Sequence, residues 1–168
     1  MTIQVGDKLP AAKLKAVTPE GATDMTTEDL FSGKKVVLVG LPGAFTPTCN
    51  NNHVPGYLEN QDALAAKGVD TIAVLSVNDQ FVMAAWARFL GAENRIMFLA
   101  DGNCDFTDAI GMGIDLGVAG FGRRCQRFSA LIEDGVVTAL NIEEQRGDAT
   151  NSGAAFMLEQ LAKTSQAA

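Results

Sequence analysis

A single cysteine stands in a turn-like stretch that also holds the only histidine of the chain. The stretch LPGAFTPTCNNNH runs from Leu41 to His53 and places Cys49 four residues before that histidine. A thiolate is a strong nucleophile and a target for oxidation, and an imidazole can accept its proton. These residue types allow redox chemistry, nucleophilic catalysis by a Cys–His pair, or a buried thiol that takes part in no reaction.

The residues before Cys49 favour a reactive thiol. The apolar run Val36–Leu41 predicts a buried strand that ends at Pro42-Gly43, so we expect Cys49 in the first turn of the next helix. Unpaired backbone N–H groups at a helix start favour the thiolate form of a cysteine. Pro42 fixes the backbone where the turn begins, and the hydroxyl of Thr46 can reach the sulfur or the molecule that it attacks.

His53 leaves more than one interpretation open. On an unbroken helix it would share a face with Cys49, as a cysteine hydrolase requires, but Pro55 is expected to interrupt that helix. A role in which His53 contacts the reacting residues without touching the substrate, or a place at an interface, fits this pattern better. A metal site is not expected, because one His and one Cys leave two ligand positions of a tetrahedral site unfilled.

Apolar β-branched runs alternate with segments of helical period, which predicts an α/β protein. Asp134-Gly135 separates two strand-like runs and is typical of a two-residue hairpin turn. Trp86 shares the apolar face of a predicted helix with Phe81 and Phe89, so we expect it to anchor the core or an interface. The predicted elements are strands at Val36–Leu41, Val69–Val77, Ile96–Ala100, Phe128–Glu133 and Val136–Leu140, and helices at 57–67, 80–90 and Ser152–Lys163.

This order predicts a single domain over residues 1–168. A βαβ unit is followed by a helix and a strand, then by a hairpin and a closing helix. A parallel core with an antiparallel edge and helices on both faces should result. The expectation is a thioredoxin-like α/β fold, in which helices flank a central mixed β-sheet, with additions at the N-terminus.

Composition and charge exclude several classes of protein. The chain is 47% hydrophobic and 20% charged, with a net charge of −7, so it should be globular and should not bind nucleic acid. Its apolar runs fall short of the roughly 20 residues that span a bilayer, and its start lacks the pattern of a signal peptide. We expect a cytoplasmic protein without membrane association or cofactor, in which Cys49, Cys104 and Cys125 remain thiols.

The residues around Cys49 resemble the peroxiredoxin family. Pro42, Thr46 and Cys49 match the pattern P-x-x-x-[T/S]-x-x-C, and the string PGAFTPTC is similar to the type II, or atypical, branch. Four separate blocks in the same order extend the resemblance over nearly the whole chain. These blocks are Val-Pro-Gly at 54–56, Leu-Ser-Val-Asn-Asp at 75–79, Trp86, and Arg-Phe-Ser at 127–129.

The resemblance implies a thiol peroxidase that reduces hydrogen peroxide and organic hydroperoxides. Cys49 would attack the peroxide and become a sulfenic acid, while Thr46 would hydrogen-bond the peroxide and Pro42 would shield the sulfur. Arg127 would stabilise the thiolate and the charge on the leaving oxygen. The neighbours Arg123 and Arg124 are set aside only because the match lies at Arg-Phe-Ser. Gly43 and Phe121 would line the substrate pocket.

The resemblance also bears on how the oxidised cysteine is reduced. Where type II relatives often carry a resolving cysteine, this chain reads Ile-Ala-Val at 72–74 and Thr-Asn-Ser at 150–152. With Cys104 and Cys125 elsewhere, a 1-Cys mechanism with an external thiol is expected. Glutathione, with or without glutaredoxin, is the first candidate and thioredoxin the second. Association around the active-site loop and the neighbouring helix would give a homodimer.

Two other classes of function remain open on sequence grounds. A redox sensor would pass the oxidation of Cys49 to a protein partner, and it needs the same thiolate as a peroxidase. A thioredoxin-like binding module would use no chemistry at all, and replacement of Cys49 would leave its function intact.

Overall fold

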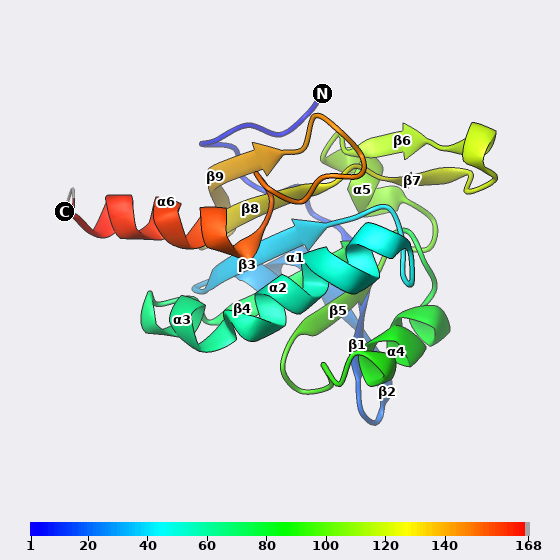
Figure 1. Ribbon diagram of the computed structural model, residues 1–168, viewed down its shortest axis with the longest axis horizontal. Helices are drawn as coiled ribbons and strands as arrows, with labels where there is room; N and C mark the ends of the chain where they lie inside the picture. Colours follow the sequence, from blue (N-terminus) through cyan, green and yellow to red (C-terminus); the bar gives the residue numbers. More distant parts are fainter. Residues whose placement is uncertain (167–168) are drawn as a thin grey trace.

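A seven-stranded mixed β-sheet forms the centre of the computed structural model, which describes residues 1–166 (Figure 1). The strand order is β2-β1-β5-β4-β3-β8-β9, in which β3, β4 and β5 run parallel and the outer pairs are antiparallel. These strands are β1 (Lys13–Thr18), β2 (Gly21–Thr26), β3 (Lys35–Gly40), β4 (Thr71–Ser76), β5 (Met97–Ala100), β8 (Phe128–Glu133) and β9 (Val136–Ile142). A separate small sheet pairs β6 (Gly113–Asp115) with β7 (Arg123–Cys125).

Helices surround the central sheet (Figure 1). They are α1 (Thr27–Phe31), α2 (Val54–Glu59), α3 (Gln61–Ala66), α4 (Gln80–Phe89), α5 (Asp105–Ala109) and α6 (Ala154–Gln166). Two short turns complete them: the π-helical turn η1 (Cys49–His53) and the 3-10 turn η2 (Gly117–Ala119). Of the helices formed by residues 1–166, none is long and apolar enough to cross a bilayer.

The inner strand β3 is buried on both of its faces. Val37 and Val39 pack in one core with residues of α2, α4 and α6. Val36 and Leu38 alternate with them and pack in a second core with residues of α1 and α5. A strand with no exposed face reads as a continuous apolar run, which is why the sequence predicted it correctly. The thioredoxin-like fold with helices on both faces is confirmed.

The predicted hairpin and the N-terminal addition are both present. Asp134 and Gly135 join β8 to β9 with φ angles of 49° and 77°, the left-handed conformations that this kind of two-residue turn needs. The addition at the N-terminus is the hairpin of β1 and β2, and β1 pairs antiparallel with β5. It extends the sheet on the side away from β8.

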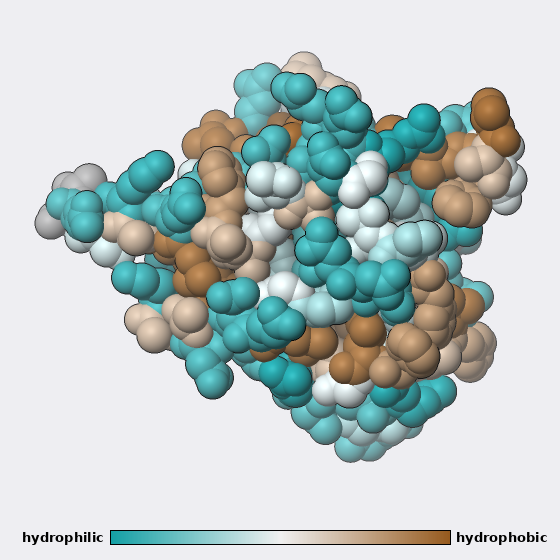
Figure 2. Space-filling view, viewed as in Figure 1, coloured by the Kyte–Doolittle hydropathy of each residue, from teal (hydrophilic) through white to brown (hydrophobic). Residues whose placement is uncertain are grey.

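Two helix predictions differ from the structure. The helix predicted over 57–67 is divided into α2 and α3, because the Asn60 side-chain amide donates to the Gly56 carbonyl at 2.8 Å and competes with the regular ladder. On α4, Phe81 and Phe89 are 76% and 66% exposed, although Trp86 between them is fully buried. Hydrophobic residues gather over α4 and the loop before α2, at the lower right of Figure 2.

Gly40, the last residue of β3, leaves no room for a side chain. A Cβ at this position would overlap the ring of Phe128, which is its partner on β8 and is fully buried. Because β8 begins directly after Arg127, this close approach of two strands also sets where that arginine stands.

We expect Gly40→Ala to lower the free energy of unfolding by about 1–3 kcal/mol, because the Phe128 ring must move in a packed core. Gly56→Ala is the matched control, since a Cβ there meets open space within helix α2 and should stabilise by roughly 0.5–1 kcal/mol. Urea unfolding at neutral pH measures both variants. Equal effects of the two substitutions would contradict the packing argument.

Candidate active site

The turn after β3 holds Cys49 at the start of a helical segment. This segment begins at residue 47 and continues through η1 into α2. Thr46 closes the turn: its Oγ1 donates to the Gly43 carbonyl at 2.8 Å, and its own carbonyl accepts from the Asn50 N–H at 2.8 Å. Cys49 is fully buried. The structure thus places Cys49 at a helix start, as the sequence predicted.

The π-helical turn η1 carries the chain past Pro55 without a break. The Val54 N–H donates to the Cys49 carbonyl, one residue further back than in an α-helix. Pro55 then falls in the first turn of α2, where a missing N–H is tolerated. The expectation that Pro55 interrupts the helix is therefore wrong, because the wide turn absorbs the missing hydrogen bond.

Arg127, which directly precedes β8, brings its guanidinium from the strand next to β3 to the Cys49 sulfur. Its Nη2 lies 3.3 Å from the Cys49 Sγ, although the two residues are 78 positions apart. The Nε and Nη2 groups also donate to the Arg146 carbonyl, each at 3.3 Å. Arg127 is 4% exposed. The buried guanidinium of Arg127 thus points at the Cys49 sulfur.

The ion pairs within residues 1–166 lie elsewhere, and they join Lys15 to Asp24, Lys35 to Glu133, and Arg123 to Asp108. No carboxylate in this part of the chain neutralises Arg127. A buried cation is costly unless it is paired. The side-chain groups that this buried guanidinium contacts are the Cys49 sulfur and the neutral imidazole of His53.

The two ring nitrogens of His53 face Arg127 and the Ser152 carbonyl rather than Cys49. Its Nδ1 lies 3.0 Å from Arg127 Nη1, and its Nε2 lies 3.1 Å from the Ser152 carbonyl. An arginine can only donate and a carbonyl can only accept, so the imidazole is neutral with its proton on Nε2. Tyr57 donates to the same carbonyl at 2.6 Å. His53 is 1% exposed, which leaves almost no imidazole surface for contact with a partner chain.

Burial lowers the pKa of His53 from its usual 6.5 to about 4. The hydrogen bond to Ser152 opposes this shift, and the Arg127 charge adds to it. A neutral imidazole that already accepts from Arg127 cannot also take the proton of Cys49. The geometry thus disfavours the Cys–His pair of a hydrolase.

A pocket of about 270 Å³ is lined by residues of the turn that leads to Cys49 and by Arg127, which contacts the Cys49 sulfur. Pro42, Thr46, Phe121 and Arg127 all line it, so four residues singled out in the sequence meet here. Gly43 follows Pro42 in the same turn, and a Cβ on it would come within 3.0 Å of the Arg124 guanidinium. Its expected place in the pocket lining stays a prediction. The other lining residues are Pro47, Thr48, Leu116, Ala119, Arg146 and Gly147.

Trp86 belongs to the core beneath the active-site helix. Its Nε1–H donates to the Asn50 side-chain carbonyl at 2.8 Å, and its ring packs edge-on against Phe98 with centroids 5.6 Å apart. The residue is fully buried. Of the two sequence-based alternatives for Trp86, the structure therefore favours the core anchor.

The other two cysteines are buried thiols that resist ionisation. Burial raises the pKa of Cys104 to about 11, and its hydrogen bond to Asp108, at 3.5 Å, acts in the same direction. Burial also raises the pKa of Cys125 far above its usual range. Within residues 1–166, no group of three or more His, Cys, Asp or Glu side chains is arranged to hold a metal ion.

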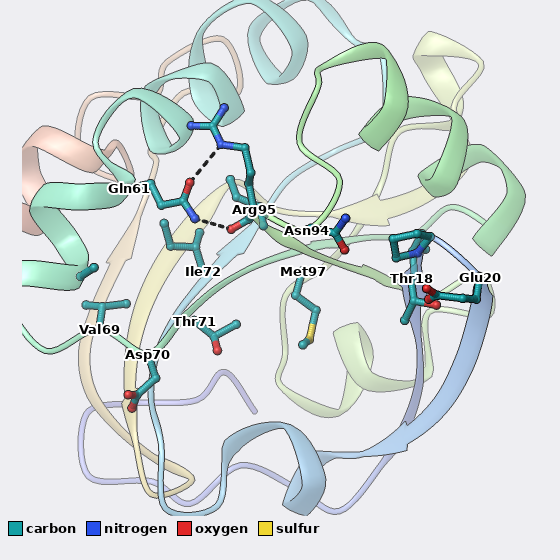
Figure 3. Close-up of a pocket in the computed structure, with 14 residues that line it drawn as sticks. Thr18, Glu20, Gln61, Val69, Asp70, Thr71, Ile72, Asn94, Arg95 and Met97 are labelled. Carbon is teal, nitrogen blue, oxygen red and sulfur yellow. Dashed lines mark hydrogen bonds between the residues drawn. The ribbon is translucent and has the colours of Figure 1, made fainter.

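A cavity of about 530 Å³ lies at the opposite end of the sheet (Figure 3). Its lining includes Thr71 and Met97, which open β4 and β5, whereas Cys49 follows the carboxyl end of the parallel strand β3. Gln61 and Arg95 are joined there by two hydrogen bonds, from Gln61 Nε2 to the Arg95 carbonyl at 2.7 Å and from Arg95 Nε to Gln61 Oε1 at 3.1 Å. The described residues that line this cavity include no thiol.

Sequence reasoning missed the residues that hold Arg127 and His53 in place. Arg146 and Ser152 act through their backbone carbonyls, and every residue type carries a carbonyl, so no side-chain pattern could reveal them. Thr48 donates to the Gly147 carbonyl at 3.0 Å and ties the same loop to the active-site turn. The phenol of Tyr57 was equally hidden, since the apolar spacing of its helix explains its presence.

Comparisons with known proteins agree with the resemblance seen in the sequence. The family model described as Redoxin matches residues 4–158. Peroxiredoxin-2E, chloroplastic, of Arabidopsis thaliana is 46% identical over 164 residues, which cover 95% of this chain and 70% of that protein. Peroxiredoxin-2C of Oryza sativa subsp. japonica is 46% identical over 160 residues, with coverages of 95% and 98%. The crystal structure of reduced Prx3 in complex with H2O2 from Vibrio vulnificus has a TM-score of 0.89 and 47% identity, and covers 95% of this chain and 99% of that one.

The neutral, buried His53 should make stability depend on pH. Because the unfolded imidazole takes up a proton near pH 6.5 and the folded one only near 4, the free energy of unfolding should fall as pH drops between these values. The slope is about 1.4 kcal/mol per pH unit, or about 3 kcal/mol in all. His53→Gln, which can keep both hydrogen bonds without titrating, should lack this contribution.

Urea unfolding at several pH values across this window measures the effect. The chain has one histidine, so the carboxylates contribute equally in both proteins and cancel in the difference. His53→Asn serves as a second neutral variant. Identical pH profiles for wild type and both variants would rule out a buried, neutral His53.

Proposed function

This chain belongs to the peroxiredoxins, a family of thiol-dependent peroxidases, and we propose that its cycle runs through a sulfenic acid on Cys49 that an external thiol reduces. The observation that carries the proposal is the buried contact of Arg127 with the Cys49 sulfur at 3.3 Å beside an open pocket. A charged donor aimed at a thiol stabilises both the nucleophile and the oxygen that leaves.

In the first step, the Cys49 thiolate attacks the terminal oxygen of the peroxide. A sulfur–oxygen bond forms as the oxygen–oxygen bond breaks, and the leaving alkoxide or hydroxide takes a proton to become alcohol or water. Arg127 stabilises the charge on the leaving oxygen. Thr46 donates to the Gly43 carbonyl, which leaves its hydroxyl oxygen to accept a hydrogen bond from the peroxide O–H. Pro42 lines the pocket and has no N–H that could bind competing water.

In the second step, an external thiol condenses with the sulfenic acid to give a mixed disulfide and water. A second thiol then releases Cys49 as the disulfide of the reductant forms. Cys104 and Cys125 are buried and keep their protons at neutral pH, which supports a 1-Cys mechanism. The burial of Cys49 favours a small thiol such as glutathione, whose adduct glutaredoxin could then remove, over direct attack by thioredoxin. Because this cycle needs a pool of reduced thiols, we place the protein in the cytoplasm.

We also propose that the protein forms a homodimer through the apolar surface beside the active-site turn. Phe45 and Phe89 pack edge to face with ring centroids 5.5 Å apart, and both are exposed, at 45% and 66%. Phe81 on the same helix is 76% exposed. Exposed aromatic rings gathered in one patch are typical of a protein–protein contact. The patch is the hydrophobic area over α4 in Figure 2.

A single-turnover reaction with hydrogen peroxide, read by intact mass, tests the peroxidase mechanism. Wild type should gain one oxygen, and added glutathione should convert this product to a glutathione adduct. The Cys49→Ser variant should gain neither, whereas Cys104→Ser and Cys125→Ser should react as wild type does. Undiminished oxidation of Cys49→Ser would refute the peroxidase proposal, and an internal disulfide lost in either other variant would refute external resolution.

Replacement of Phe89 by glutamate should disrupt the proposed dimer, because it buries a charge in an apolar contact. Analytical ultracentrifugation should find wild type as a dimer and the variant with an affinity at least tenfold weaker. Val5→Glu is the control, since Val5 is 62% exposed but lies outside the aromatic patch. A monomeric wild type, or equal weakening by both substitutions, would contradict the proposal.

A further inference from the structure

The loop between β9 and α6 is tied closely to the Cys49 turn. The Thr48 hydroxyl donates to the Gly147 carbonyl at 3.0 Å, and Arg127 donates to the neighbouring Arg146 carbonyl through Nε and Nη2 at 3.3 Å. At the far end of the loop, Glu143 Oε1 accepts from the Ser152 N–H at 2.7 Å and from its hydroxyl at 2.9 Å. These contacts fix the backbone of Arg146 beside the pocket.

The side chain of Arg146 is exposed and forms part of the pocket lining. Arg127 is the other charged residue of this lining, so the described residues around the pocket carry two positive charges and no negative one. The ion pairs found in residues 1–166 involve Lys15, Lys35 and Arg123, so the Arg146 guanidinium is left available. The residues that line the pocket are thus positively charged on a protein whose net charge is −7.

Part of the pocket lining is apolar. Leu116, Ala119 and Phe121 come from η2 and its flanks, and the same lining also contains Thr48 and Arg146. A pocket with an apolar part and an exposed guanidinium suits a ligand whose carbon chain ends in a carboxylate. Arginine is the side chain best shaped for such a group, since it can donate two parallel hydrogen bonds.

We propose that Arg146 is the carboxylate anchor of this pocket and selects reactants that carry a carboxylate over their uncharged counterparts. The inference rests on the proposed function, because the ligand must place its reacting atom at Cys49. Two reactants of the cycle share this chemistry: a hydroperoxide with a carboxylate tail, and a thiol reductant with carboxylates, such as glutathione. In either case the carboxylate lies at Arg146 and the chain lies against the apolar part of the lining.

The test compares each acid with its ester in the two half-reactions. Oxidation of Cys49 is timed with linoleic acid hydroperoxide and with its methyl ester, and reduction of the sulfenic acid with glutathione and with its diethyl ester, both by rapid quench and intact mass. The measured quantity is the ratio of the acid rate to the ester rate. This ratio cancels any change in Cys49 reactivity that arises because Arg146 also supports Arg127.

Arg146→Gln should lower the acid-to-ester ratio by about three- to tenfold in at least one half-reaction, the size expected for one exposed charged contact. Arg146→Lys should recover part of the loss. Lys67→Gln is the matched control, since it removes the same charge from an exposed site outside the pocket and should leave the ratio unchanged. The half-reaction that responds identifies which of the two reactants carries the carboxylate.

Three results would overturn the assignment: an unchanged ratio in Arg146→Gln, an equal fall in Lys67→Gln, or no recovery in Arg146→Lys. These outcomes are distinct from failure of the peroxidase proposal. In that case wild type itself would not be oxidised on Cys49 by any peroxide. A wild type that turns over with an Arg146-independent ratio would refute the carboxylate anchor alone.

Discussion

The buried guanidinium of Arg127 imposes the main physical constraint on this structure. In the part of the chain that the structure describes, its charge faces the Cys49 sulfur and no carboxylate. Its other partners are neutral: the Arg146 carbonyl and the imidazole of His53. A carboxylate in either place would satisfy the arginine and remove its pull on the sulfur. The site therefore depends on partners that orient the cation without neutralising it.

Two parts of the fold place Arg127 beside the Cys49 turn and hold its neutral partners in position. The close approach of Gly40 to the Phe128 ring sets β3 against β8, so the strand that leads to Cys49 lies beside the one that follows Arg127. On the other side of the imidazole from Arg127, the Ser152 carbonyl accepts from both His53 and Tyr57, which fixes the ring proton on Nε2, while burial keeps the imidazole neutral. The loop between β9 and α6 thus serves the site through its backbone, and one of its side chains, Arg146, reaches the pocket.

The three cysteines lie in different environments. All three are buried, so exposure alone does not distinguish them. Cys49 lies against a cation at a helix start, whereas Cys104 faces Asp108 and Cys125 lies within an apolar core. The neighbouring groups, rather than access to solvent, distinguish Cys49 from the other two thiols.

The sequence by itself determined the features that depend on local pattern. The buried strand at 36–41, the hairpin at Asp134-Gly135 and the position of Cys49 at a helix start follow from apolar runs, turn chemistry and a proline. The choice of Arg127 among three nearby arginines came from a family motif, because composition treats them alike. Only the tertiary structure decided that His53 supports Arg127 and that Arg146 lines the pocket. These outcomes depend on contacts between residues far apart in the chain, and on backbone carbonyls that no residue type reveals.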